Sequence, residues 1–589
     1  MDNNKIAFIT CVNDETMYSE CLMYIRNLRI PNDYEIELVP IRDAKSITSA
    51  YNSAIKQTDA KYKVYLHQDT LIVNKNFIED ILEIFSKNND IGMIGLTGAK
   101  NIPTNGIWWE SKQCYGEVYE SHTGTMQLLS FKKVEKCYEE VKAIDGFIMI
   151  TQYDVPWRED IFDGWHFYDI SQSIEFGLNG YKVIVPTQKK PWSLHDCGLL
   201  NTENGHEEYR QKFLQEYSTK IFPLVSILIP TYNRPEYFKL ALDSVINQTY
   251  KNIEIIIGDD STNNETEELV FNEYLNKYDN IKYYHNEKNI GQFDNDLKLM
   301  KLANGKYINF LMDDDLFKYN KIEKMMNYFI NDFNEEISLV TSHRAVINEN
   351  SKYGGIFGET DLIFNKDVVL TGEESANFLL QNNFNYIGEP TTVLFRKCKL
   401  TESFGILNGI RYGCNVDIAS WLNLLSNGNM VFINECLSFF RRFEGQQSAT
   451  DKMKVLGAID YINEILTSRE NGFLDDDDEY KLGINNCVKY CEMILHELKN
   501  KYKKGDCLID YIKLEKKYKI LEIKKNEITN IYEHINENTV SKKIEFVVYG
   551  NNNKKCIEYI KKLDIPNKYE ISIKAIKEKR NKAIAYDRA

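Results

Sequence analysis

The chain has 589 residues, a length that predicts several domains. Hydrophobic residues make up 43% of it and aromatic residues 12%, so the composition supports sizeable cores and excludes wholesale disorder. The net charge of −15 excludes broad binding to nucleic acids or anionic membranes, which requires basic surfaces, but it leaves room for a local basic site that binds a sugar nucleotide.

Neither the N-terminus nor the cysteines indicate export. The opening residues, MDNNKIAFIT, lack the basic segment and apolar core of a signal peptide, and no apolar run is long enough to span a membrane. The twelve cysteines are scattered without a CxxC pair, and the helical spacing of Cys487 and Cys491 favours packing over zinc binding. Free thiols predict a reducing, cytoplasmic location, where nucleotide sugars are made.

Residues 1–200 alternate between predicted strands and helices. A strand is predicted at Ile6–Cys11 and a helix at Tyr18–Arg29, followed by strands that end at Ile41 and at Leu66. This alternation is typical of an α/β domain built on a parallel sheet.

Side chains that can bind a metal recur in this first segment. His67-Gln68-Asp69 follows a predicted strand, Asp145 leads another, Asp169 stands near the start of a helix, and His195 comes near the end of the segment. Carboxylate and imidazole together suit Mn²⁺. A helix-starting Asp169 and a structural His195 are the alternative reading.

The segment 222–450 begins with a strand, a polar turn and a helix. Val225–Pro230 reads as the strand, and Pro235 suits the first turn of a helix at Glu236–Asn247. A second strand, Ile253–Ile257, ends in Gly258-Asp259-Asp260-Ser261. Two successive strands therefore lead into polar loops.

Three consecutive carboxylates follow the next apolar run. Tyr307–Met312 reads as a buried strand, so Asp313, Asp314 and Asp315 should emerge at its C-terminal edge, where ligands bind in open α/β sheets. Hard oxygen ligands at such an edge suit Mg²⁺ or Mn²⁺, which typically hold substrate phosphates. A solvated acidic loop is the alternative.

This order of motifs resembles glycosyltransferase family 2, whose nucleotide-binding half has the GT-A fold. The matching stretches are VSILIPTYNRPEYFKLALDSVINQTYKNIEIIIGDDS from Val225, NEKNIGQFDNDL from Asn286 and GKYINFLMDDD from Gly305. Several ordered motifs over about 240 residues make a more specific match than an acidic triplet alone.

The resemblance implies roles for individual residues in binding a nucleotide sugar. Asp313 and Asp315 would flank a divalent cation that bridges the donor's two phosphates. Either Asp259 or Asp260 would contact the uracil or ribose, with Thr231 nearby. The residues assigned to nucleotide-sugar binding are, in full, Thr231, Arg234, Asp259, Asp260, Asp314 and Arg441.

The resemblance also implies a general base in a later motif, at the start of a helix. Asp417 fits this place, since it precedes an amphipathic stretch that ends at Gly428. Its alternative role, an acid that interacts with the helix dipole, is compatible with catalysis. Upstream, the loop Gly388–Thr392 should face the acceptor.

One departure from the family pattern lies in the stretch Phe440–Ser448. Phe443 stands where relatives often carry a histidine that binds the metal, so Glu444 or water would have to serve instead. Arg441 and Arg442 could donate to the diphosphate, or they could form surface ion pairs. The departure puts metal dependence in doubt more than fold.

The first segment resembles a second, more distant GT-A group, the glycosyltransferase-like domains with an HQD motif. The resemblance implies Asp69 and His195 as metal ligands and Asp169 as the base. This domain would be a second transferase, or a degenerate copy that binds acceptor.

The last two segments differ in texture. Residues 451–540 read as helices, with an inter-helix loop at Asp475–Asp478, and could hold the modules together or pair two chains. Residues 543–589 repeat the N-terminal segment, so that Phe546 lines up with Phe8 and Tyr569 with Tyr34 after one three-residue gap. The repeat either belongs to a longer protein, which we favour, or docks on another domain.

Together these patterns predict an α/β protein with two GT-A, Rossmann-like domains of the nucleotide-diphospho-sugar transferase type, a helical segment and a partial third repeat. We expect an inverting, Mn²⁺- or Mg²⁺-dependent transferase that moves a hexose or N-acetylhexosamine from a UDP-sugar. Either a flagellin- or adhesin-like protein or a polysaccharide fits as acceptor. The alternatives are a two-site glycan polymerase and a non-catalytic carbohydrate-binding scaffold.

Overall fold

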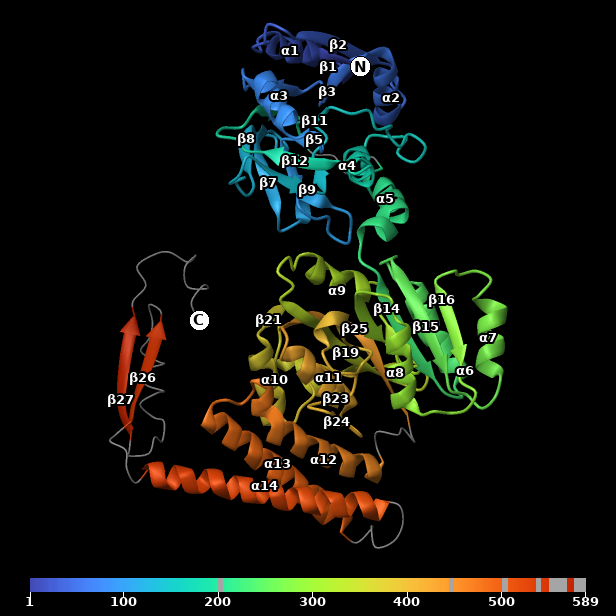
Figure 1. Cartoon of the computed structure of the whole chain (residues 1–589), viewed down its shortest axis with the longest axis vertical. Helices are drawn as coiled ribbons and strands as arrows, with labels where there is room; N and C mark the ends of the chain where they lie inside the picture. Colours follow the sequence, from blue (N-terminus) through green and yellow to red (C-terminus); the bar gives the residue numbers. More distant parts are fainter. Residues whose placement is uncertain (200–204, 444–449, 500–506, 537–541, 550–568, 577–589) are drawn as a thin grey trace.

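The computed structural model describes residues 1–199, 205–443, 450–499, 507–536, 542–549 and 569–576. Two α/β units follow one another along the long axis of the molecule, and three helices pack below the second unit (Figure 1). Among the described residues, no helix is both long and apolar enough to cross a membrane. The structure contains α/β units and a helical segment, as the sequence predicts.

The first unit is built on a seven-stranded sheet with the strand order β2-β1-β3-β11-β5-β12-β9. β1 pairs in parallel with both β2 and β3. The strands are β1 (Asp2–Val12), β2 (Glu35–Arg42), β3 (Ala60–His67), β5 (Ile91–Gly95), β9 (Tyr138–Val141), β11 (Ile148–Thr151) and β12 (Lys182–Pro186).

Alternation along β1 divides the core of this unit between the two faces of the sheet. Ile6 and Phe8 pack with residues of α1 and α3, whereas Ala7 and Ile9 pack with residues of α2 and α4. The helices are α1 (Glu15–Arg26), α2 (Ile47–Gln57), α3 (Phe77–Lys87) and α4 (Tyr168–Leu178).

Helix α1 begins three residues earlier than the sequence predicts. Asp14 caps it, because its side chain accepts hydrogen bonds from the backbone N–H groups of Thr16 and Met17. The polar first turn hides this start from a reading based on apolar spacing.

A second sheet in the same unit has the order β10-β6-β7-β13-β4, with β8 beside β7. Its antiparallel pairing of β13 with β4 sets His195 opposite Thr70. The strands are β4 (Thr70–Ile72), β6 (Thr97–Ala99), β7 (Cys114–Glu120), β8 (Gln127–Ser130), β10 (Ala143–Ile144) and β13 (Ser193–His195), and a 3₁₀ turn covers Trp108–Glu110. This pairing brings together the two ends of the predicted metal motif.

The second unit contains a ten-stranded sheet with the main order β16-β15-β14-β17-β22-β19-β25-β18. Its first four strands are parallel, as the β-α-β pattern predicts. The strands are β14 (Val225–Thr231), β15 (Ile253–Asp259), β16 (Ile281–His285), β17 (Tyr307–Phe310), β18 (Leu316–Phe317), β19 (Ile337–Asn348), β20 (Tyr353–Ile356), β21 (Val368–Leu370), β22 (Leu394–Arg396) and β25 (Asn429–Arg442), and β23 (Ile406–Leu407) pairs with β24 (Ile410–Arg411).

The helices of this unit cover the sheet (Figure 1). They are α6 (Pro235–Ile246), α7 (Glu265–Glu273), α8 (Gln292–Leu302), α9 (Lys321–Ile330), α10 (Gly372–Asn382) and α11 (Val416–Leu425), with 3₁₀ turns at Phe357–Leu362 and Lys397–Lys399. Pro235 occupies the first turn of α6, as predicted.

The two units share an apolar core. Phe213 and Tyr217 of α5 (His206–Ile221) belong to the same buried cluster as Ile255 of β15 and Phe329 of α9. Thr104 also donates from Oγ1 to the carbonyl of Glu323, at 3.1 Å.

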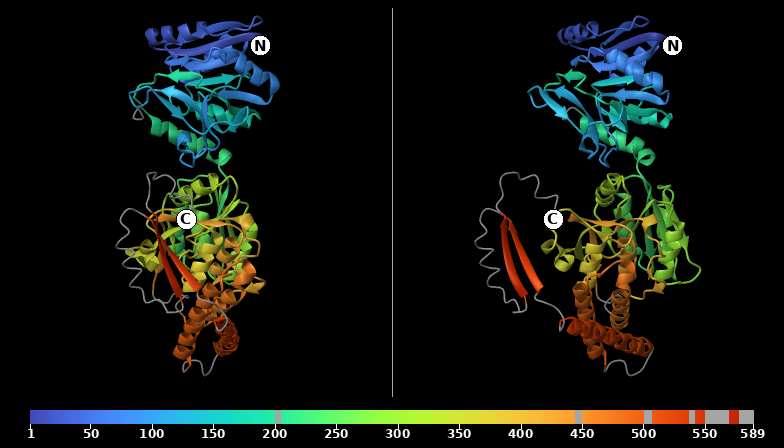
Figure 2. Two further views of the ribbon diagram at one scale, coloured as in Figure 1. Left: turned by 90° about the vertical axis from the view of Figure 1, so that its left-hand side faces the viewer. Right: turned by 60° about the vertical axis from the view of Figure 1, so that its left-hand side comes forward.

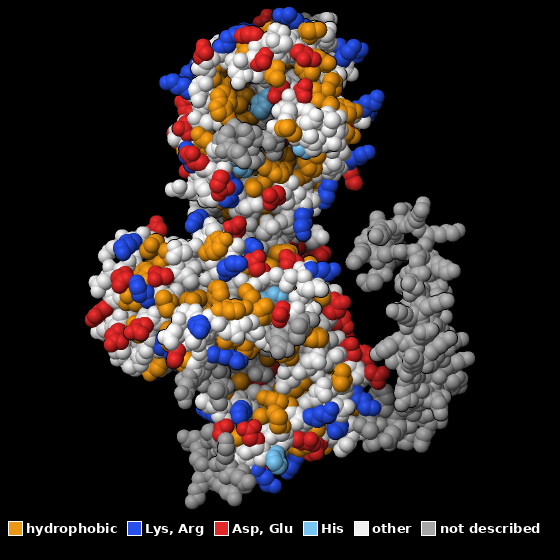
Figure 3. Space-filling model, turned by 180° about the vertical axis from the view of Figure 1, so that it is seen from behind, with side chains coloured by type: hydrophobic (Ala, Val, Ile, Leu, Met, Phe, Trp, Pro, Cys, Tyr) orange, Lys and Arg blue, Asp and Glu red, His pale blue; other side chains and the backbone are white. Residues whose placement is uncertain are grey.

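Acidic and basic side chains are interspersed over the face drawn in Figure 3, and no broad basic patch is visible there.

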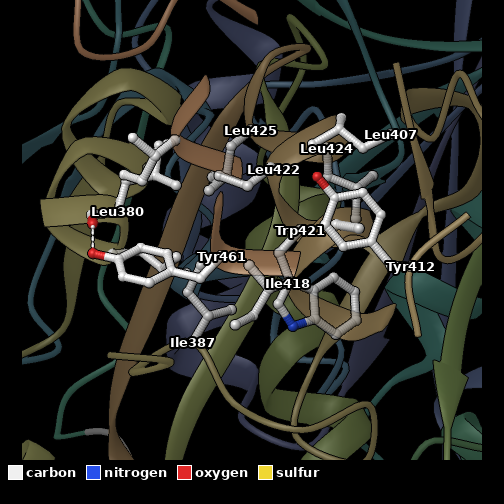
Figure 4. Packing of buried hydrophobic residues seen from close by; sticks show 14 of the residues in the cluster. Leu380, Ile387, Leu407, Tyr412, Ile418, Trp421, Leu422, Leu424, Leu425 and Tyr461 are labelled. Atoms are coloured by element: carbon white, nitrogen blue, oxygen red, sulfur yellow. Dashed lines mark hydrogen bonds between the residues drawn. The ribbon is translucent and has the colours of Figure 1, made fainter. Parts of the chain in front are cut away.

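The helical segment extends the core of the second unit rather than forming a separate one. Buried residues of α12, including Tyr461, lie in one cluster with Trp421 of α11 and Leu380 of α10 (Figure 4). Tyr461 donates from its hydroxyl to the carbonyl of Leu380, at 2.7 Å. The helices are α12 (Asp451–Thr467), α13 (Asp477–Leu498) and α14 (Cys507–Asn536), with a 3₁₀ turn at Ser468–Asn471.

The acidic run at 475–479 is not an inter-helix loop as expected, because most of it starts α13. Asp476 caps the helix by accepting from the N–H groups of Asp478 and Glu479, and the acids of the first turn favour the positive end of the helix dipole. Cys487 and Cys491 are both fully buried on α13, in agreement with a packing role.

A separate two-stranded ribbon, β26 (Lys542–Tyr549) and β27 (Tyr569–Ile576), stands apart from the other sheets (Figure 2). The strands are parallel, and Lys543 pairs with Glu570. In β1 and β2 the equivalent pair is Lys5 with Glu35. The equal register supports the repeat seen in the sequence, whose remaining residues lie outside the described ones.

Replacing Tyr461 by alanine should test whether α12 and the sheet share one core. We expect a loss of about 3–5 kcal/mol, because a buried aromatic ring and its hydrogen bond disappear, and so a fall in melting temperature of at least about 6 °C. Calorimetry should show one shifted transition for the second unit and the helices together. Leu482→Ala, at a side chain 47% exposed, is the control; a separate helical transition that shifts alone would contradict the shared core.

Candidate active site

A cavity of about 1090 Å³ lies at the carboxyl ends of the parallel strands in the second unit. β14 contributes Thr231 and β17 leads into the acidic triple, because the ends of neighbouring parallel strands meet at one edge of the sheet. The lining residues on which the argument below depends are Thr231, Arg234, Asp260, Asp313, Asp314, Asp315, Glu389, Arg442 and Phe443. The cavity therefore gathers motifs that are up to 212 residues apart in the chain.

Asp313 and Asp314 are tied to the turn that follows β14. Asp313 accepts at Oδ2 from the hydroxyl of Thr231, at 3.0 Å, and from the backbone N–H of Tyr232, at 3.2 Å. Arg234 places Nη1 at 3.0 Å from Asp314 Oδ2 and 3.5 Å from Asp313 Oδ1. Burial, and then the charge of Asp314, raise the pKa of Asp313 to about 6.

Asp315 points into the protein as well as lining the cavity. Its Oδ2 accepts from the hydroxyl of Thr391, at 2.6 Å, and its Oδ1 accepts from the backbone N–H of Arg441, at 2.9 Å. Burial raises the pKa of Asp315 well above its usual range. Both oxygens are therefore engaged with the loop at 388–392 and with β25.

The structure separates the two acids that end β15. Asp260 lines the cavity and accepts from the backbone N–H groups of Ile290 and Gly291. Asp259 is completely buried and accepts from the hydroxyl of Tyr283, at 2.6 Å. Of the two acids that the sequence left open, Asp260 is the one the fold brings to the cavity.

Asp417 is the second residue of α11 and is held by a neighbouring loop. Its Oδ2 accepts from Asn385 Nδ2, at 2.8 Å. Burial, with a further contribution from the charge of Glu389, raises the pKa of Asp417 to about 7. Trp421 of the same helix donates from Nε1 to the carbonyl of Gly388, at 2.8 Å.

A second cavity, of about 760 Å³, adjoins this region. Asn385, the partner of Asp417, lines it, and Glu389 and Arg442 line both cavities. Arg344 Nε forms a buried ion pair with Glu389 Oε2, at 2.5 Å. Asp417 is not among the residues that line either cavity; it is next to the second one through its hydrogen bond with Asn385.

The two arginines of β25 have different surroundings. Arg441 is fully buried, and its guanidinium donates to the backbone carbonyls of Asp314 and Asn348 and to the hydroxyl of Ser351. It is not among the cavity-lining residues, whereas Arg442 is. Phe443 also lines the cavity, and the carbon of the Arg234 guanidinium lies 5.1 Å from the centre of its ring. Glu444 lies outside the described residues.

Sequence reasoning missed several residues of the two cavities and of the surroundings of Asp417. Asn385 lies in a short connection with no recognisable motif, and Arg344 is a buried arginine within β19. Phe357 and Phe440, which also line the first cavity, read as ordinary apolar residues. No local signal in the sequence distinguishes any of these residues.

The first unit brings three predicted or adjacent side chains together at the end of β3. His67 Nδ1 lies 3.4 Å from His195 Nε2 and 4.0 Å from Asp69 Oδ1, and His195 Nε2 lies 3.5 Å from Asp69 Oδ1. These spacings and this donor set fit one divalent ion. Asp69 Oδ1 is buried without a hydrogen-bond partner in the structure, which fits an oxygen that serves as a metal ligand.

Neighbouring groups orient this trio. His67 Nε2 shares a hydrogen bond of 2.6 Å with the hydroxyl of Tyr168, which leaves Nδ1 facing the other two donors. Asp169, the next residue of α4, is half-buried, and desolvation followed by the charge of Asp145 raises its pKa to about 7. The sequence did not single out His67 as a ligand, although the HQD motif contains it.

Both units match models of glycosyltransferase families. Residues 7–217 match the model described as "Glycosyltransferase like family", and residues 226–384 match "Glycosyl transferase family 2". Asp417 and Arg441 lie beyond the matched segments. The chain spans less than half the length of several curated relatives, 44% of one and 20% of two others.

The match with this chain covers a larger share of two other curated relatives. An uncharacterized glycosyltransferase of Rickettsia typhi, RT0329, is 34% identical over 232 residues, which are 39% of this chain and 67% of that protein. The Escherichia coli protein named UDP-Glc:alpha-D-GlcNAc-diphosphoundecaprenol beta-1,3-glucosyltransferase WfgD is 29% identical over 231 residues, 39% of this chain and 81% of that protein.

Among solved structures, S. aureus TarS 1–349 in complex with UDP-GlcNAc matches with a TM-score of 0.37 and 17% identity, over 49% of this chain and 79% of that chain. The family matches in two segments confirm the resemblance and the α/β, GT-A fold class drawn from the sequence. The chain belongs to the family 2 glycosyltransferases.

Proposed function

We propose that the second unit, residues 222–443, transfers a hexose or N-acetylhexosamine from a UDP-sugar to a hydroxyl group of a protein or glycan, with inversion at the anomeric carbon. The observation that carries this proposal is the cavity that gathers Thr231, Arg234, Asp260 and the acidic triple at one sheet edge. The naming of a relative as a UDP-glucose-dependent enzyme supports UDP as the nucleotide.

On the donor side, Asp260 would contact the uracil or ribose and Arg234 a phosphate, with Thr231 holding Asp313 in place. Carboxylate oxygens at this edge suit Mn²⁺ or Mg²⁺, and Asp313 with Asp315 would hold the ion, which when bound would neutralise the departing diphosphate. Because Arg441 is buried, we assign the second cationic contact to Arg442.

On the acceptor side, Asp417 would take the proton from the attacking hydroxyl. A carboxylate with a pKa of about 7 is well matched to this role near neutral pH. Asn385 fixes the direction of the carboxylate, because its amide donates to one of the two oxygens. An attack from this side, opposite to the leaving diphosphate, would invert the anomeric centre.

We also propose a cytoplasmic location for the protein.

Asp417→Asn should abolish transfer while sparing the donor. We expect kcat to fall by about 100- to 10,000-fold, because the amide cannot accept the proton, and the Kd of the donor to stay within about twofold. A screen of UDP-, GDP- and TDP-sugars, with and without Mn²⁺, identifies the donor first. Asp279→Asn, at an exposed loop, is the control. Retained turnover would contradict the assigned base, and no UDP release with any donor would favour a carbohydrate-binding scaffold.

The rate should follow the ionisation of Asp417. At a pH below its pKa the carboxyl group is protonated and cannot accept a proton. The value of kcat/KM should therefore rise with pH and reach half its maximum at about pH 7. Glu389→Gln removes a neighbouring negative charge and should move this limb to lower pH. A half-maximum near pH 4 in the unmodified protein would contradict the environment described for Asp417.

A second transfer site in the first unit is the alternative that a specific observation favours. His67, Asp69 and His195 would hold a divalent ion, and Asp169 would act as base. Two sites in one chain would fit a glycan polymerase that alternates two sugars. In that case Asp69→Ala would block elongation but not the first addition.

Direct Mn²⁺ binding tests the trio independently of activity. We expect Asp69→Asn or His195→Ala to weaken Mn²⁺ binding at one site by at least about 10- to 100-fold, as measured by calorimetry and by electron paramagnetic resonance. His206→Ala, an imidazole that packs against Trp109 and Phe167, should leave binding unchanged. Equal Mn²⁺ binding in all three variants would contradict a metal site at this place.

A further inference from the structure

The loop that leads into α11 is held by a single carboxylate from the helical segment. The backbone N–H groups of Gly413, Cys414 and Asn415 all donate to Asp460 Oδ2 on α12, at 3.0, 2.7 and 3.0 Å. Three successive N–H groups on one oxygen fix the path of this loop, because each bond constrains a neighbouring peptide. Asp417 follows two residues later.

A second acid, one turn further along α12, holds the cap of α11. Asn415 Nδ2 donates to Glu464 Oε1, at 2.8 Å. Asn415 is the N-cap residue of α11, but its side chain makes no capping bond to that helix. The usual local cap is thus replaced by a contact with a distant helix.

Close packing accompanies these bonds. A Cβ atom on Gly457 of α12 would lie 3.4 Å from Cys414 Sγ, at ordinary van der Waals distance, so the helix packs directly against the loop. Asp460 is 3% exposed and Glu464 1% exposed. Burying two carboxyl groups costs free energy unless hydrogen bonds compensate for the lost water. The groups that donate these hydrogen bonds belong to residues 413–415, which lead to Asp417.

The other side of α11 is anchored to the loop that borders both cavities. Trp421 donates to the carbonyl of Gly388, and Asn385 donates to Asp417 itself. The first turn of α11 is therefore held between the loop on one side and α12 on the other. Among the described contacts, neither Asp460 nor Glu464 accepts a hydrogen bond from the donor-facing wall, which is formed by β14 and the acidic triple.

We propose that Asp460 and Glu464 are positioning residues for Asp417, so that α12 completes the transfer site of the second unit. The inference rests on the proposed function, in which Asp417 is the base. Loss of these contacts should let the first turn of α11 move and misplace the carboxylate, while the donor cavity keeps its shape.

Asp460→Asn should lower kcat by about 10- to 100-fold, the cost of a small misplacement of a catalytic group. Donor Kd should stay within about twofold, and the amides of 413–415 should exchange hydrogen faster. Glu464→Gln should give the same pattern more weakly. Glu497→Gln on α13, whose partner is Lys454 at the surface, is the control that should leave turnover and exchange unchanged.

A double-variant experiment separates positioning from general damage. In an Asp417→Glu background, where the base is already displaced, Asp460→Asn should cost less than about threefold more, because effects that pass through one group are not additive. An undiminished loss in that background, an unchanged kcat in the single variant, or an equal loss of donor binding would overturn the inference.

Hydrogen exchange keeps this test distinct from that of the proposed function. If the unmodified protein transfers no sugar, the proposed function fails, and the exchange at 413–415 still reports whether Asp460 holds the loop. If Asp460→Asn does not fold, Glu464→Leu and Asn415→Ala, which remove the second contact alone, carry the same expectation for kcat and donor Kd. Unchanged exchange or unchanged kcat in them would overturn the proposal.

Discussion

The burial of several carboxyl groups in a confined region is the constraint on which the second unit depends. Asp313 and Asp315 are buried and Asp417 is half-buried, so reduced contact with water favours the neutral form of each carboxyl group and raises all three pKa values. The protein keeps them where they are by supplying Thr231, Arg234, Thr391 and Asn385 as partners. Much of the surrounding polar structure serves to hold these acids.

This constraint also explains how the parts of the molecule are joined. The carboxyl ends of the parallel strands deliver the donor residues, α11 delivers Asp417, and α12 supplies the polar contacts that α11 does not make for itself. The apolar cluster around Trp421 and Tyr461 then makes α10, α11 and α12 one packed body (Figure 4). A site assembled from segments so distant in the chain requires such a body, because Asp313 is held from β14 and both Asp315 and Asp417 from the connection between α10 and β22.

Much of this arrangement could be predicted from local patterns. The two strands predicted at Val225–Pro230 and Ile253–Ile257, which the structure extends to Thr231 and Asp259, follow from apolar runs, and the helix start at Pro235 and the position of Asp417 at the start of α11 follow from turn chemistry. Contacts between distant segments could not be predicted. Nothing near Arg441 shows that its guanidinium turns inward to backbone carbonyls, and nothing near Arg344 shows that it pairs with Glu389. The acidic run at the start of α13 was predicted wrongly because charge alone does not distinguish the capped first turn of a helix from a loop.

The matching registers of the two parallel ribbons bear on the history of this chain. A slip of one residue would turn every side chain of a strand to the opposite face, so pairing cannot drift gradually once a core has formed on it. The connection between the paired strands, by contrast, is three residues shorter in the second copy, as the offsets of Lys5 with Glu35 and Lys543 with Glu570 require. An ancestral gene duplication would leave this mark: strand pairing inherited unchanged, and loop length altered freely between the copies.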